Sequence, residues 1–307
     1  MTAFGNQAPA DLVRFMETFG SPPGETPLSL LSRYDSLLNA GGPDVQVRSA
    51  VPVCELDGWR VTVDVHVPGD PGPWPTVVFF HGGAWTMGSP ASHSRMAREF
   101  AGAGFLTLSV DYPRAPKWRF PAAHQAALRA VEWTHAHGGD FGSDGTIALA
   151  GDSTGANLAA GVLAVHDRPP VSAAVLMYGI YDFHAALPLL APLVGGATPQ
   201  EQLYVPTESY EELRDDPRLS PLHAADRFPP CWLGVGTRDP LFSETAALAA
   251  ALERAGVEHE YLPVTGAPHS YLQMPFLAEY AAGHRSMQAF LRCHSGSRNW
   301  RGNDTIL

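Results

Sequence analysis

The first forty residues of the chain carry apolar side chains at helical spacing. Residues 10 to 19 and 28 to 40 each repeat a hydrophobic position every three or four residues, which predicts two amphipathic helices. The apolar positions are Leu12, Phe15, Met16 and Phe19 in the first segment, and Leu30, Leu31, Tyr34, Leu37 and Leu38 in the second. The prolines and glycine of SPPGETP between them interrupt the pattern, so we expect two separate helices.

Between Val45 and Val67 the pattern changes to alternation with a period of two. The apolar face holds Trp59, Val61, Val63, Val65 and Val67, and the polar face holds Arg60, Thr62, Asp64 and His66. Asp57-Gly58 is a favoured two-residue turn. We therefore predict an antiparallel hairpin.

From residue 76 onward, short apolar strands alternate with helical segments. Strands are predicted at residues 76–80, 105–110, 146–150, 172–178, 231–235 and 259–264, and helices near 92–103, 121–137, 155–165, 243–255 and 276–292. Continuous apolar strands separated by helices predict an α/β protein with a mostly parallel sheet and helices on both faces. Ligands of such sheets bind at the carboxyl ends of the strands.

Residues 181–225 interrupt this alternation. They are rich in proline and contain no clear strand, and a long insertion of this kind is uncommon unless it covers a site. We predict a lid at 181–225 over a core formed by 46–180 and 226–292. The polar, aperiodic residues 293–307 are expected to form a flexible tail.

Composition narrows the class of protein. The chain has 307 residues, 45% of them hydrophobic and 17% charged, and no apolar stretch long enough to span a bilayer. The N-terminus lacks a basic segment followed by an apolar one, so we expect a cytoplasmic protein. Cys54, Cys231 and Cys293 are too widely spaced for a zinc site, and neither a metal nor an organic cofactor is expected. The net charge of −11 with Lys117 as the only lysine argues against nucleic acid or an anionic membrane as partner.

The sharpest chemical signal is Gly-Asp-Ser-Thr-Gly at residues 151–155, between a predicted strand and a predicted helix. A tight strand-turn-helix presents Ser153 at the tip of the sheet and needs glycines on both sides for close approach. The N–H of Thr154 at the start of the helix is placed to donate to a developing oxyanion.

A serine hydroxyl needs a base and an orienting acid before it becomes a nucleophile. Asp239 follows the predicted strand 231–235, and His269 follows the predicted strand 259–264. The chain order Ser153, Asp239, His269 is that of the α/β-hydrolase arrangement. His81-Gly82-Gly83-Ala84-Trp85 follows another strand, so Gly83 and Ala84 are expected to supply N–H groups to an oxyanion hole, with Gly82 making the turn.

These residues resemble the hormone-sensitive-lipase-like branch of the α/β-hydrolase family, which includes many bacterial carboxylesterases. The resemblance covers about residues 50 to 292, and besides HGGAW and GDSTG it includes DY at 111–112, FPAA at 120–123, SPL at 220–222 and RDPL at 238–241. It implies a serine esterase with a cap built from residues 1–45 and 181–225. A small-molecule ester is the implied partner, and the oligomeric state stays open, a homodimer included.

The sequence departs from the family pattern at several positions. Ala84 stands where the family has a third glycine, and Thr154 stands where it has alanine. Pro113 and Lys117 replace an arginine and a glutamate, so the ion pairing of that loop is not carried over. Aromatic residues flank the motifs and are expected to line an apolar pocket: Trp85, Trp118, Phe120, Tyr181, Phe183 and Tyr271.

The sequence therefore predicts hydrolysis of small to medium, largely apolar carboxylic esters through an acyl-enzyme on Ser153. Two alternatives stay open. An arylformamidase or other amidase could use the same three residues, and a non-catalytic small-molecule binder could use the same scaffold.

Overall fold

The computed structural model of the chain describes residues 8–20, 23–190, 204–205 and 209–295. It begins with α1 (Ala10–Thr18) and α2 (Pro27–Leu38), which lie where the periodicity predicts them. A capping box starts α2, because the Thr26 and Ser29 side chains each accept a hydrogen bond from the backbone N–H of the other residue. The two helices share an apolar cluster made of Leu12, Phe15, Met16, Leu30, Leu38 and Met274.

Within the described residues, one eight-stranded sheet forms the centre of the molecule, in the order β1-β2-β4-β3-β5-β6-β7-β8. The strands are β1 (Gln46–Leu56), β2 (Trp59–Val67), β3 (Trp74–Phe80), β4 (Leu106–Asp111), β5 (Ser143–Asp152), β6 (Ala173–Met177), β7 (Cys231–Gly236) and β8 (His259–Val264). Only the pairs β1–β2 and β2–β4 are antiparallel. The predicted mostly parallel sheet with an N-terminal hairpin is confirmed.

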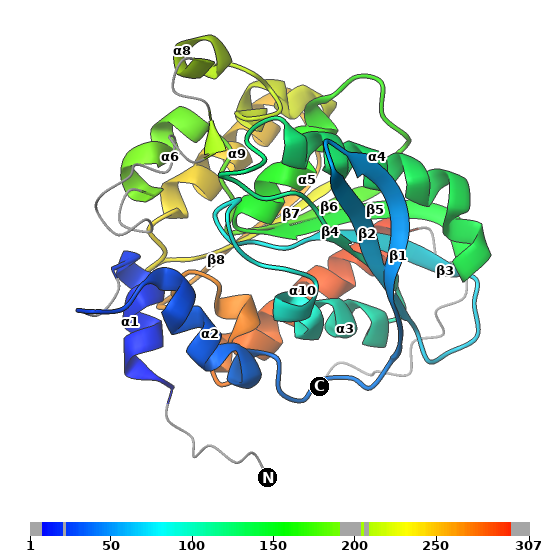
Figure 1. Cartoon of the computed structure of the whole chain (residues 1–307), viewed down its shortest axis with the longest axis horizontal. Coiled ribbons are helices and arrows are strands. Elements are labelled where there is room, and N and C mark those ends of the chain that lie inside the picture. Colours follow the sequence, from blue (N-terminus) through cyan, green and yellow to red (C-terminus); the bar gives the residue numbers. More distant parts are fainter. Residues whose placement is uncertain (1–7, 21–22, 191–203, 206–208, 296–307) are drawn as a thin grey trace.

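Helices cover both faces of the sheet (Figure 1). One face packs against α3 (Ser94–Gly102) and α10 (Ala278–His294), and the other against α4 (Ala122–His137), α5 (Thr154–Ala164) and α9 (Phe242–Ala255). The helix α10 extends two residues past its predicted end, and residues 296–307 of the predicted tail lie outside the described residues. No described helix has both the length and the apolar composition needed to cross a bilayer.

The predicted lid at 181–225 is described only in part, because residues 191–203 and 206–208 lie outside the described residues. It includes α6 (Phe183–Leu190), α8 (Tyr210–Leu213) and a 3-10 segment, Pro221–Arg227. Its first residues are fixed to the core, because the buried Glu244 carboxylate accepts the N–H groups of Tyr181 and Asp182 at 2.9 and 2.8 Å. Burial raises the pKa of Glu244. The lid role itself stays a prediction.

The polar face of the hairpin, as the alternation defines it, is more buried than its polar side chains suggest. His66 is buried, and desolvation lowers its pKa to about 4.

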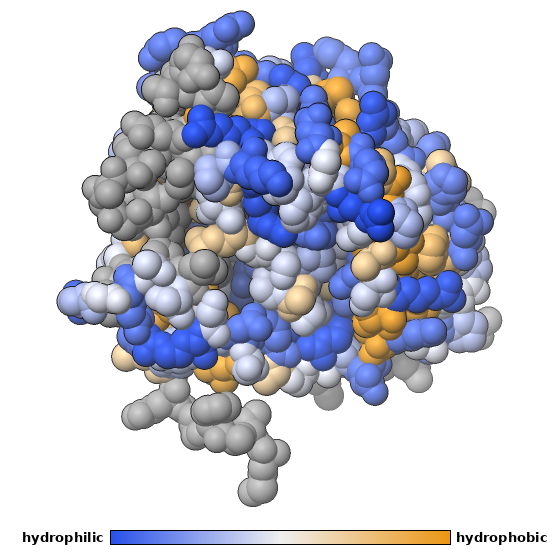
Figure 2. All heavy atoms as spheres, in the orientation of Figure 1, coloured by the Kyte–Doolittle hydropathy of each residue, from blue (hydrophilic) through white to orange (hydrophobic). Residues whose placement is uncertain are grey.

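The face of the molecule drawn in Figure 2 is largely hydrophilic, with hydrophobic residues in separate small groups. Such scattered groups are normal for a protein surface.

Candidate active site

Ser153 occupies a strained turn between β5 and α5. Its backbone has φ 53° and ψ −120°, a conformation that costs a non-glycine residue on the order of 1–3 kcal/mol. A Cβ at Gly151 would lie closer than 3.0 Å to the Gly155 carbonyl oxygen, and one at Gly155 would meet the Phe80 carbonyl as closely. The two glycines therefore allow strand and helix to approach, and the Ser153 N–H donates to the Met177 carbonyl on β6 at 2.8 Å.

The structure brings Ser153, His269 and Asp239 together at the carboxyl ends of their strands. Nε2 of His269 lies 3.0 Å from Oγ of Ser153, and Nδ1 lies 2.8 Å from Oδ2 of Asp239. The Asp239 carboxylate is buried, and its other oxygen accepts the Leu241 N–H at 2.8 Å. Since a carboxylate only accepts hydrogen bonds, Nδ1 of His269 carries the proton and Nε2 is left to accept the serine proton.

The glycine-rich loop after β3 folds back toward the serine. The N–H of Gly82 donates to Oδ1 of Asp152 at 2.8 Å, and Nδ1 of the buried His81 donates to the Gly82 carbonyl at 2.8 Å. Gly82 therefore shapes the turn, since its N–H already has an acceptor. The oxyanion hole stays a prediction, with Gly82 making its turn and Gly83, Ala84 and Thr154 supplying its N–H groups. Gly83 and Ala84 line the cavity beside Ser153. Thr154 is the first residue of α5, where a backbone N–H has no partner within the helix.

A cavity of about 430 Å³ opens onto Ser153 and His269. Its apolar wall comes from the N-terminal helices and the loop after β3, through Phe15, Met16, Phe19, Leu31, Leu38 and Met87. Its polar wall includes Asp35, Ser89, Ser92, His93, Asp152 and Gln273. This volume is within the range of small-molecule sites.

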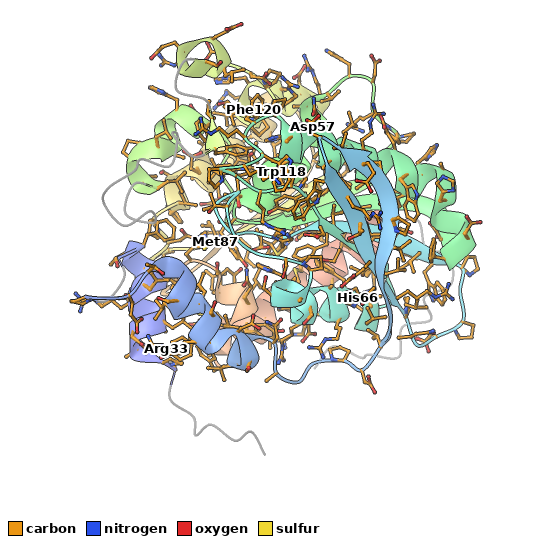
Figure 3. The ribbon with its side chains drawn as sticks, viewed as in Figure 1. Arg33, Asp57, His66, Met87, Trp118 and Phe120 are labelled. Carbon is orange, nitrogen blue, oxygen red and sulfur yellow. The ribbon has the colours of Figure 1, made fainter. Side chains whose placement is uncertain are left out.

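None of the six aromatic residues predicted for the pocket lines this cavity. Five of them are buried in the core: Trp85, Phe120, Tyr181, Phe183 and Tyr271. Trp85 shows the reason, because its ring turns away from the glycine loop and stacks on Tyr204 at 4.3 Å. Trp118 packs on Trp59 at the hairpin and donates to the Asp57 carbonyl, and Figure 3 shows it near Asp57, apart from Met87.

The buried carboxylate of Asp152 links three loops around the serine. Besides the Gly82 N–H, it accepts a hydrogen bond from Nε2 of Gln273 at 2.5 Å, and Nε2 of His93 lies 3.5 Å away. Gln273 lies in the 3-10 segment Tyr271–Gln273, directly after the His269 loop. Asp152 thus fixes the glycine loop and the histidine loop relative to each other. No sequence motif pointed to Gln273.

Among the residues that the structure describes, no group of three or more His, Cys, Asp or Glu side chains is arranged to hold a metal ion. The imidazole of His269, paired with the Asp239 carboxylate, can activate the Ser153 hydroxyl for attack on a carbonyl carbon.

Comparison with known proteins agrees with this geometry. Residues 77–273 match the model of a family described as α/β hydrolase fold. The carboxylic ester hydrolase LipN of Mycobacterium tuberculosis is 33% identical over 246 residues, which cover 74% of this chain and 65% of LipN. Carboxylesterase NlhH of the same species is 32% identical over 223 residues, covering 68% of this chain and 70% of NlhH. An ethyl acetate hydrolase of Pseudomonas putida is 29% identical over 240 residues, covering 73% of this chain and 76% of that protein.

Solved structures give the same result. An esterase of Pyrobaculum calidifontis superposes with a TM-score of 0.74 at 25% identity, covering 89% of this chain and 94% of the esterase. An α/β-hydrolase enzyme from the metagenome of Lake Arreo superposes with a TM-score of 0.79 at 24% identity. This match covers 96% of this chain and 100% of the Lake Arreo chain. The second likeness concerns the fold alone.

The bond between Gln273 and Asp152 predicts an effect on turnover. Gln273→Leu removes a donor to a charged group, so we expect kcat/KM for an ester to fall about tenfold. The matched control is Gln288→Leu on α10, because Gln288 donates to the Glu99 carbonyl and does not line the cavity. Steady-state kinetics of both variants test this, and wild-type kcat/KM in Gln273→Leu would show that the bond does not matter.

Proposed function

Because the chain belongs to the α/β-hydrolase family, we propose that it is a serine carboxylesterase that hydrolyses small to medium, largely apolar carboxylic esters. The observation that carries this proposal is the series of hydrogen bonds from Ser153 through His269 to Asp239 at the wall of a cavity. Relatives named as carboxylic ester hydrolases support ester bonds as the target.

In the proposed mechanism, Ser153 Oγ attacks the ester carbonyl carbon while Nε2 of His269 takes its proton. Asp239 orients the imidazole and stabilises the positive charge that develops on it. The carbonyl oxygen becomes an oxyanion that accepts N–H groups of Gly83, Ala84 and Thr154. Collapse of this intermediate breaks the ester C–O bond, and His269 returns the proton to the leaving alcohol. Water, activated by the same histidine, then hydrolyses the acyl-serine.

The shape of the cavity supports the proposed substrate size. Phe15, Phe19 and Leu31 close one side of the cavity, so an extended chain meets the N-terminal helices. On this basis we assign the N-terminal residues 1–45 to a cap and expect short to medium acyl chains to fit best. That residues 181–225 belong to the same cap stays a prediction, because none of the described residues of that segment lines the cavity. A cytoplasmic location and a homodimer stay predictions from the sequence.

Neither alternative has an observation of its own in its favour. A non-catalytic binder has no need of a serine within 3.0 Å of an imidazole that is itself paired with a buried carboxylate. An arylformamidase or amidase would use the same geometry, but the named relatives act on esters.

Hydrolysis of p-nitrophenyl esters from acetate to decanoate tests the proposal. We expect the highest kcat/KM at short to medium chains and a loss of at least about a thousandfold in kcat for Ser153→Ala and for His269→Ala, because each removes a member of the reacting series. Circular dichroism of both variants serves as the folding control. Undiminished turnover in Ser153→Ala would overturn the proposal.

Charge on the substrate provides a second test. Asp35 and Asp152 line the cavity, whereas no lysine or arginine does so among the described lining residues. Two carboxylates should repel an anionic substrate by about 1–2 kcal/mol, so we expect about tenfold lower kcat/KM for monoethyl succinate than for ethyl succinamate, its neutral isostere. Asp35→Asn should narrow this gap. Equal kcat/KM values for the two esters in the wild type would contradict it.

A further inference from the structure

The N-terminal helix α1, through its C-cap residue Phe19, contacts the imidazole of His269 directly. The Phe19 ring lies edge-on to the imidazole, with ring centroids 5.0 Å apart. The His269 backbone N–H donates to the Met16 carbonyl at 3.2 Å. Both the backbone and the ring of this histidine are therefore held by residues from the opposite end of the chain.

The same turn of α1 is also attached to the loop that carries Asp239. Arg238 and Glu17 form an ion pair, in which Nη2 donates to Oε2 at 2.8 Å and Nη1 lies 2.8 Å from Oε1. Since Arg238 directly precedes Asp239, the helix contacts both loops that supply the proposed base and acid.

The imidazole also packs against the core. Tyr178 follows β6, and its ring is edge-on to His269 with centroids 5.0 Å apart. Its backbone has φ 41°, and its N–H donates to the Gly234 carbonyl at 2.7 Å, so the neighbouring strand holds this residue in a strained conformation. His269 thus contacts one aromatic ring fixed by the sheet and another supplied by the end of α1.

We propose that α1 positions His269 for proton transfer, with Phe19 and the Met16 carbonyl as the positioning groups, in addition to forming a wall of the cavity. This proposal rests on the proposed esterase function. The bond to Asp239 fixes one edge of the imidazole but leaves the ring free to tilt about that bond, and Phe19 blocks this tilt. A displacement of the base by about 1 Å can cost on the order of a hundredfold in rate.

Phe15 provides the contrast. It is buried on the same helix and lines the same cavity, but its ring has no contact with His269 among the described ring contacts. If α1 is only a wall, loss of either ring should raise KM. If α1 positions the base, loss of Phe19 should lower kcat instead.

The experiment compares Phe19→Ala with Phe15→Ala on p-nitrophenyl acetate and hexanoate. We expect Phe19→Ala to lower kcat about 10- to 100-fold on both esters, because the base is misplaced whatever the acyl chain. For Phe15→Ala we expect the main effect to be a several-fold rise in KM for hexanoate. Leu12→Ala, which removes buried bulk from α1 outside the cavity, is the control for stability and should keep wild-type kcat.

Two milder variants keep the proposal testable if Phe19→Ala does not fold. Phe19→Leu retains most of the buried volume, so we expect kcat to fall only about fivefold. Glu17→Gln removes the ion pair to the exposed Arg238, and we expect kcat to fall about twofold. A rise in KM with unchanged kcat in the Phe19 variants would overturn the positioning role and leave the esterase proposal standing. A wild type that hydrolyses neither ester would overturn the esterase proposal itself.

Discussion

The strained backbone at Ser153 is the constraint on which the rest of the site depends. With φ 53°, the chain turns from β5 into α5 within one residue, which places Oγ beyond the sheet and the first N–H groups of the helix beside it. The strain of roughly 1–3 kcal/mol is offset by the hydrogen bond to Met177 and by the close packing that Gly151 and Gly155 permit. A relaxed turn would move the hydroxyl away from His269.

The parallel sheet explains how distant residues reach this serine. Strands β3, β5, β7 and β8 end at one edge, and the loops that follow them carry the glycine turn, Ser153, Asp239 and His269. Buried polar contacts then fix these loops relative to one another, above all the Asp152 carboxylate between Gly82 and Gln273. The site is therefore a property of the whole sheet edge.

The sequence predicted those parts of the structure that local patterns determine. Periodicity located the strands and helices, and the motif around Ser153, with its glycines, identified the tight strand-turn-helix. The pocket was predicted less well, because nearness to a motif does not say which way a side chain points. Trp85 follows the glycine loop directly, yet it packs into the core against Tyr204.

Much of the apolar cavity wall comes from α1, its C-cap residue Phe19, and α2. The amphipathic pattern of these helices was visible, but pattern alone does not say what a helix packs against. Contacts such as Phe19 with His269 and Gln273 with Asp152 join segments far apart in the chain, so only the folded structure shows them.

The central claim is that His269 makes the Ser153 hydroxyl nucleophilic. Mass spectrometry after incubation with diethyl p-nitrophenyl phosphate tests it most directly, because this reagent phosphorylates an activated serine. We expect one diethylphosphoryl group on the peptide that contains Ser153, added at least about a hundredfold more slowly in His269→Ala. A label on another residue, or an equal rate in the variant, would contradict it.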